Sequence, residues 1–111
     1  MATAKEKLDG VNARLKGLFK ADGKSMMGFK SLADAAMRPG KISPAIKELT
    51  AVAIAVAKGC DDCIVYHVAA AKKHGASREE LVEMLAVAVE LAGGPGAVYG
   101  GRALECFDDL G

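Results

Sequence analysis

Residues 43–75, SPAIKELTAVAIAVAKGCDDCIVYHVAAAKKHG, contain the two segments that decide the fold. Ser43 is a preferred N-cap residue, and Pro44 suits the first helical position because its missing N–H would have no partner there. The run that follows is rich in alanine, the best helix former, and reaches Gly59, a residue type that commonly ends helices. A strand of this length and alanine content would be unusual. The sequence therefore predicts a helix that begins at Pro44 and ends at Gly59.

This first helix is apolar on all sides. Between Leu49 and Ala57, only Thr50 is polar. Such a helix is buried in a core or in an interface between protomers. In so small a chain, an uncovered apolar face would favour aggregation, so we expect a homo-oligomer.

The second segment predicts another helix, from Cys60 or Asp61 to His74. Its first turn carries two acidic residues and its last turn carries basic residues, which suits the helix dipole at both ends. Gly75 follows as a stop signal. The two predicted helices would therefore be joined by a very short connection at Gly59.

The remaining sequence also has helical periodicity, and no segment favours a strand. We expect an all-α, single-domain helical bundle of about six helices. Residues 1–40 are expected to form an N-terminal helical layer of the same domain, and residues 41–111 its core. The other predicted helices are Lys5–Lys20, Lys24–Met37, a helix from a capping box at Ser77 to Ala92, and Ala97–Asp109 after a break at Gly93–Gly96.

Composition excludes several classes of protein. The net charge is +1, with 15 basic and 14 acidic residues, which argues against a nucleic-acid partner. The longest apolar run, Leu49 to Ala57, is far shorter than the ~20 residues of a membrane span. Met1 to Gly10 is polar and charged, unlike a secretory signal. We therefore expect a cytoplasmic protein with no membrane partner, in which cysteines are reactive or metal-binding rather than structural.

The candidate site is the motif formed by Cys60, Cys63 and His67. Offsets of three and four residues place these side chains on one face of a helix. The helix N-terminus favours a thiolate, a C-x-x-C pair can close to a disulfide, and the imidazole can take or return a proton. Opposing this, the carboxylates of Asp61 and Asp62 disfavour a thiolate beside them. The motif predicts redox chemistry.

Two other interpretations of the motif remain open. Zinc could be held by Cys60, Cys63 and His67, with His74, Cys106 or an acidic residue as the fourth ligand, although structural zinc sites usually pair two short motifs. The cysteines could also be core residues by coincidence, since free cysteine is readily buried.

Three residues outside the motif could contribute to the site or to packing. Glu48 could approach His67 if the two helices fold back on each other, and its carboxylate would then orient the imidazole; the alternative is a solvated acid in an early helical turn. Tyr66 points about 100° away from His67 on a helix and is expected to pack. Cys106 has no partner motif and is also expected to pack.

The stretch from about Ser43 to Leu104 resembles the alkyl hydroperoxidase D-like branch of the carboxymuconolactone decarboxylase family. The resemblance rests on a Glu in a helix, C-x-x-C-x-x-x-H, a G-A-[ST]-x-E-E turn, and a Gly-rich break before a Tyr. It implies an all-helical fold assembled as trimers or hexamers. One position departs from the pattern: members with peroxidase activity often have an aromatic residue or histidine before the second cysteine, where this chain has Asp62.

The resemblance also implies residue roles without a metal or organic cofactor. Cys63 would attack a hydroperoxide, Cys60 would resolve the product to a disulfide, and His67 with Glu48 would form the proton relay. A dithiol or protein reductant would restore the pair. The alternatives are a decarboxylase or related lyase that uses His67 as acid and base, and a non-enzymatic zinc-binding or redox-sensing oligomer.

Overall fold

A computed structural model describes residues 2–111, and all regular structure in this range is helical. The predicted all-α fold of about six helices is confirmed. The helices are α1 (Ala4–Ala21), α2 (Gly23–Ala36), α3 (Pro44–Lys58), α4 (Asp61–Lys73), α5 (Arg78–Ala92) and α6 (Gly94–Asp109). None of these helices is long and apolar enough to cross a membrane.

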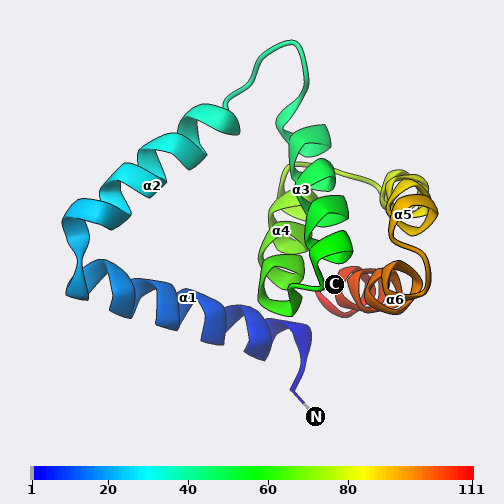
Figure 1. The fold of residues 1–111 in the computed structure, drawn as a ribbon, viewed down its shortest axis with the longest axis horizontal. Helices are drawn as coiled ribbons and strands as arrows, with labels where there is room; N and C mark the ends of the chain where they lie inside the picture. Colours follow the sequence, from blue (N-terminus) through cyan, green and yellow to red (C-terminus); the bar gives the residue numbers. More distant parts are fainter. Residues whose placement is uncertain (1) are drawn as a thin grey trace.

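The six helices form a packed group of four with a two-helix arm (Figure 1). Helices α3 and α4 lie side by side at the centre, and α5 and α6 cover one flank of this pair. Helix α1 lies across α4 and then extends away from the core, and α2 folds back from its far end. Within the described residues, α2 packs only against α1. The division into a layer at residues 1–40 and a core at 41–111 stays a prediction.

The core is built mainly from one side of α3 and the facing sides of α4 and α5. The largest fully buried side chains are Leu49, Val52, Val56, Ile64, Val68 and Leu81. Full burial of such a side chain stabilises the fold by about 1.5–3 kcal/mol. Ile54 of α3 is 55% exposed in the single chain, so burial of this side of the helix in an interface between protomers stays a prediction.

The connection between α3 and α4 fixes the start of the candidate site. Gly59 ends α3 with a φ of 69°, a left-handed conformation that favours glycine. A Cβ added at Gly59 would lie 3.2 Å from a ring carbon of Tyr99, so the backbone also approaches α6 closely. The chain therefore reverses within two residues, which sets Cys60 at the N-terminus of α4.

The predicted break at Gly93–Gly96 is wrong in extent. Only Gly93 breaks the helical path, and α6 begins at Gly94 rather than at Ala97. Pro95 lies in the first turn of α6, where its missing N–H costs no hydrogen bond. A Cβ at Gly96 would lie 2.9 Å from the Cβ of Ala92, so this glycine permits close packing of α6 against α5.

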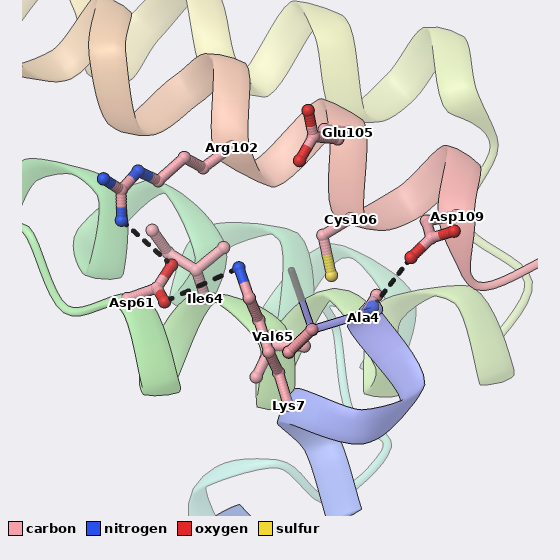
Figure 2. A pocket seen from close by; sticks show the side chains of 10 residues that line it. Ala4, Lys7, Asp61, Ile64, Val65, Arg102, Glu105, Cys106 and Asp109 are labelled. Atoms are coloured by element: carbon pink, nitrogen blue, oxygen red, sulfur yellow. Dashed lines mark hydrogen bonds and ion pairs between the residues drawn. The ribbon is translucent and has the colours of Figure 1, made fainter.

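Polar contacts attach the start of α1 to α4 and α6 (Figure 2). The backbone N–H of Ala4 donates a 2.7 Å hydrogen bond to Asp109 Oδ2 on α6. Lys7 Nζ lies 3.9 Å from one carboxylate oxygen of Asp61, and Arg102 Nη1 lies 3.6 Å from the other. A small cavity of about 40 Å³ lies among these residues and is also lined by Cys106. These contacts hold α1 beside the N-terminal turn of α4.

Candidate functional site

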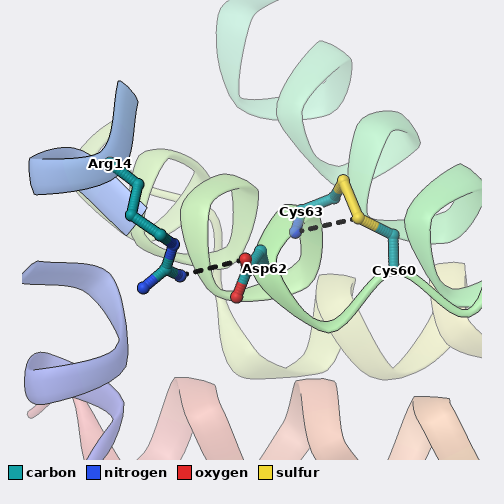
Figure 3. Close-up of a disulfide and its surroundings, with 4 residues drawn as sticks. All are labelled: Arg14, Cys60, Asp62 and Cys63. Atoms are coloured by element: carbon teal, nitrogen blue, oxygen red, sulfur yellow. Dashed lines mark hydrogen bonds and ion pairs between the residues drawn. A yellow bond between two sulfur atoms is a disulfide. The ribbon is translucent and has the colours of Figure 1, made fainter. Parts of the chain in front are cut away.

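The two cysteines of the motif are joined by a disulfide at the N-terminus of α4 (Figure 3). Cys60 is the N-cap residue and Cys63 lies in the first turn, with Cα atoms 5.2 Å apart, within the range that a disulfide can span. The backbone N–H of Cys63 donates a 3.2 Å hydrogen bond to Cys60 Sγ, so the sulfur occupies the usual place of an N-cap oxygen. The fold thus brings both sulfurs together at the N-terminus of α4.

The two cysteines differ in exposure. Cys63 is exposed, whereas Cys60 is partly buried beside the end of α3. Since a thiolate must reach its reaction partner, the more accessible sulfur is the better candidate for attack on a substrate.

His67 and Glu48 meet across the interface between α3 and α4. The Nδ1 atom of His67 lies 2.7 Å from Glu48 Oε1. Glu48 is 7% exposed and is the one buried charged residue among the residues that the structure describes. When the carboxylate is ionised it can only accept, so Nδ1–H is then the donor, and the Nε2 atom of a neutral ring keeps its lone pair. The pair leaves Nε2 as the ring atom that can exchange a proton.

Cys63 and His67 line the same cavity, which has a volume of about 370 Å³. Its size is within the usual range for sites that bind small molecules. Helices α1, α2 and α4 supply its walls. The other lining residues are Val11, Leu15, Phe19, Phe29, Lys30, Ala33, Asp34, Asp62 and Tyr66. Most of these side chains are apolar, so the cavity favours the hydrocarbon part of a ligand.

The sequence predicted that Tyr66 only packs, but in the structure it also lines the cavity. It is 42% exposed, lines the cavity and meets the edge of the His67 ring, with centroids 5.2 Å apart. The 100° offset from His67 still directs it to the cavity because the cavity extends along more than one face of α4. Cys106, in contrast, is buried on α6 in the small cavity on another side of α4.

The remaining candidate zinc ligands lie apart from the motif. His74 is the C-cap of α4, at the opposite end from Cys60. In the part of the chain that the structure describes, no group of three or more His, Cys, Asp or Glu residues is arranged to hold a metal ion.

Sequence reasoning did not identify Arg14 or the aromatic residues of the cavity wall as parts of the site. Arg14 Nη2 donates a 3.0 Å hydrogen bond to Asp62 Oδ2, across 48 positions of sequence. The helical spacing of Val11 and Leu15 indicated a buried face of α1, but nothing in the sequence indicated that this face would cover the cysteine motif.

Comparisons with known proteins identify the family of this chain. Residues 24–105 match the carboxymuconolactone decarboxylase family. An uncharacterised protein of Cupriavidus necator is 44% identical over 106 residues, which are 96% of this chain and 94% of the relative. An uncharacterised protein of the cox locus of Paracoccus denitrificans is 32% identical over 82 residues, 74% of each chain.

Two solved structures have the same fold. The first is an apo carboxymuconolactone decarboxylase family protein from Legionella pneumophila, which is 39% identical with a TM-score of 0.93, covering 96% of both chains. The second is a family protein from Thermotoga maritima, described in connection with an antioxidative response. It is 34% identical with a TM-score of 0.71, over 78% of this chain and 89% of that one.

Proposed function

The chain belongs to the carboxymuconolactone decarboxylase family, and from that premise we propose that it is a thiol-dependent peroxidase that reduces organic hydroperoxides. The observation that carries the proposal is the disulfide-forming pair Cys60–Cys63 at the wall of an apolar cavity, beside an imidazole bound to a buried carboxylate. The antioxidative context of the Thermotoga maritima relative supports the same chemistry.

In the proposed first step, the reduced Cys63 attacks the hydroperoxide. Its thiolate sulfur bonds to the terminal oxygen and the O–O bond breaks, which gives a sulfenic acid at Cys63 and an alkoxide. His67 first takes the thiol proton at Nε2 and then returns a proton to the alkoxide, which leaves as an alcohol. Glu48 holds the ring through Nδ1 and stabilises its charged form between the two transfers.

In the proposed second step, Cys60 resolves the sulfenic acid. Its sulfur attacks the sulfur of Cys63, the S–O bond breaks, and one water molecule leaves as the disulfide forms. The peroxide has then gained two electrons from the two thiols. A dithiol or protein reductant would attack the exposed Cys63 sulfur and restore both thiols by disulfide exchange.

The cavity supports an organic hydroperoxide as the substrate rather than hydrogen peroxide alone. Val11, Leu15 and Phe19 of α1 and Phe29 of α2 line it. Binding a hydrocarbon group there would remove apolar surface from water at about 25 cal/mol per Å². Hydrogen peroxide has no such group and would gain nothing from this wall.

The test is a single-turnover titration of the full chain. The protein is reduced, freed of reductant, mixed with one equivalent of cumene hydroperoxide and then alkylated. Intact mass and peptide mapping should show that Cys60 and Cys63 have lost alkylation together, with an equal amount of cumyl alcohol formed. Full alkylation of both residues with the peroxide unconsumed would refute the proposal.

The Cys63→Ser variant separates this proposal from a lyase on the same fold. A peroxidase must lose hydroperoxide consumption when the attacking sulfur is removed, whereas a lyase that uses His67 as acid and base would not depend on it. We expect peroxide reduction by Cys63→Ser to fall to the uncatalysed rate. Retention of full activity would contradict the proposed mechanism.

A further inference from the structure

The first turn of α4 presents an electrostatic problem for the proposed chemistry. Asp62 directly precedes Cys63 and lines the same cavity. A carboxylate at this position disfavours formation of a thiolate on its neighbour, because two negative charges would lie close together. The N-terminus of α4 opposes this effect only in part, since its dipole contributes a partial charge.

Arg14 supplies a counter-charge at this point. Its guanidinium, carried on α1, donates to Asp62 at 3.0 Å and lies on the side of α4 where Asp62 emerges (Figure 3). Asp61 has its own cations, Lys7 from α1 and Arg102 from α6. Each carboxylate of this turn is thus paired with a cation from another helix.

The other charges around Cys63 are already paired with each other. On α2, Lys30 Nζ lies 2.6 Å from Asp34 Oδ2. Glu48 is occupied by His67. The charged and titratable groups that line the cavity with Cys63 are Lys30 and Asp34 on α2 and Asp62, Tyr66 and His67 on α4. Around them, Arg14 binds Asp62, Lys7 and Arg102 bind Asp61, Glu48 binds His67, and Cys60 is the disulfide partner of Cys63.

We propose that Arg14 is a positioning residue that binds Asp62 and thereby keeps Cys63 able to form a thiolate near neutral pH. This inference rests on the proposed function, in which Cys63 is the attacking thiol. Arg14 acts through Asp62: it holds the carboxylate and offsets its charge. It also explains how this chain tolerates an acidic residue directly before the second cysteine.

The pair is exposed, so its effect is modest and sensitive to salt. The side chains of Arg14 and Asp62 are 65% and 59% exposed. Loss of an exposed partner is expected to move the pH midpoint of Cys63 reactivity upward by about half a unit. Because salt screens exposed charges, the shift should shrink at high ionic strength.

The experiment measures the alkylation rate of Cys63 by iodoacetamide, a neutral reagent, as a function of pH. Every variant carries Cys60→Ser, which leaves one reactive thiol in the motif and keeps a good N-cap residue. Arg14→Gln should raise the midpoint, whereas Arg14→Lys, which keeps the positive charge, should leave it close to that of the parent with Arg14. In the Asp62→Asn background, Arg14→Gln should have no effect.

Lys5→Gln is the matched control. It removes one positive charge from α1 and breaks another exposed pair, Lys5–Asp9 at 3.2 Å, that lines no part of the cavity. We expect no shift from this change. The inference is overturned if Arg14→Gln gives the same midpoint as Lys5→Gln, or if its shift persists without the Asp62 carboxylate.

The readout distinguishes this inference from the proposed function. Alkylation reports the thiolate whether or not the protein reduces peroxides. If the midpoint shifts but the protein does not reduce peroxide, the proposed function is refuted and the Arg14–Asp62 coupling is supported. If the protein reduces peroxide but the midpoint does not shift, only the proposed role of Arg14 is refuted.

Discussion

Glu48 and His67, 19 residues apart on neighbouring helices, are joined by a 2.7 Å contact between Oε1 and Nδ1. Glu48 is 7% exposed, so its carboxylate has little access to water. Burial of a charge is costly unless it is paired and hydrogen-bonded. The contact therefore serves both stability and, in the proposed mechanism, the position of the imidazole.

Replacement of the carboxylate by an amide tests the role of its charge. In Glu48→Gln, the side-chain oxygen can still accept from Nδ1, but the imidazolium loses its stabilising partner. We expect kcat/KM for cumene hydroperoxide to fall by about 10- to 100-fold, measured with a dithiol reductant in excess, with little change in the circular dichroism spectrum. An unchanged kcat/KM would exclude Glu48 from the proton relay.

His67→Ala should act on both activity and stability. It removes the proton carrier and also leaves Glu48 buried without its partner, at a cost of roughly 1–3 kcal/mol of unfolding free energy. Urea unfolding measures this loss. In the double variant Glu48→Gln/His67→Ala the loss should be smaller than the sum of the two single losses, and simple additivity would show that the contact contributes nothing.

The two cysteines should give different products when each is left alone. In Cys60→Ser, Cys63 can still react with the hydroperoxide but cannot form the internal disulfide. We expect one equivalent of alcohol and a sulfenic acid at Cys63 that is trapped by dimedone, followed by over-oxidation in excess peroxide. In Cys63→Ser, no sulfenic acid should form at Cys60. Equal dimedone labelling in the two variants would contradict the assigned order of attack.

Cys106 should remain inert while the motif reacts. Burial raises the pKa of this thiol from 9.0 to about 11, so the protonated form predominates in the folded protein at neutral pH. Native alkylation at neutral pH should therefore leave Cys106 unmodified, whereas alkylation in urea should modify it. Rapid labelling of Cys106 in the folded chain would show that the small cavity beside it opens to solvent.

The same raised pKa gives a pH dependence with a defined sign. Because the folded state holds the Cys106 proton more tightly than the unfolded state, its contribution to stability is present below about 9.0 and is lost as pH rises through about 11. The wild-type chain should thus lose more unfolding free energy across this window than Cys106→Ala. Identical slopes for the two proteins would contradict the burial of the thiol.

The helices and the motif could be predicted from sequence because their signals are local. Ser43, Pro44 and Gly59 specify one helix by the chemistry of its ends, and the spacing of Cys60, Cys63 and His67 needs only the period of a helix. The start of α6 was missed because glycine and proline residues at Gly93–Gly96 usually interrupt a helix. Here Gly93 is the N-cap of α6, Pro95 fits the first turn of this helix, and Gly96 permits close packing against α5.

The parts of the site that come from α1 and α2 could not be predicted. Arg14 and Asp62 are 48 residues apart, and no periodicity connects them. Phe29 lines the cavity because α2 turns back from the far end of α1 after one residue, Asp22, outside both helices. Tertiary arrangement thus determines the cavity wall, while the reactive residues could be found from their spacing.

Two glycines of α6 should respond in opposite ways to alanine. A Cβ at Gly96 would approach Ala92 Cβ at 2.9 Å and Ala88 O at 3.2 Å, so Gly96→Ala must push α6 away from α5. We expect a loss of about 1–3 kcal/mol. Gly101 has no atom within 4 Å of the added Cβ, and Gly101→Ala should stabilise the chain by about 0.5–1 kcal/mol. Equal effects in urea unfolding would contradict the close α5–α6 contact.

The exposed apolar side chains predict that the chain self-associates. Met27 and Leu32 on α2 are 58% and 68% exposed, on a helix that packs only against α1 within the described residues. A second copy of the chain is the simplest cover for this surface, and we expect a trimer or hexamer in sedimentation at micromolar concentration.

Leu32→Glu should shift the distribution of oligomers toward smaller species, because a charge would be buried in the interface. The neighbouring change Ser31→Glu, at an exposed polar position on the same helix, is the control. A wild-type monomer, or equal dissociation by both variants, would show that α2 does not form the interface.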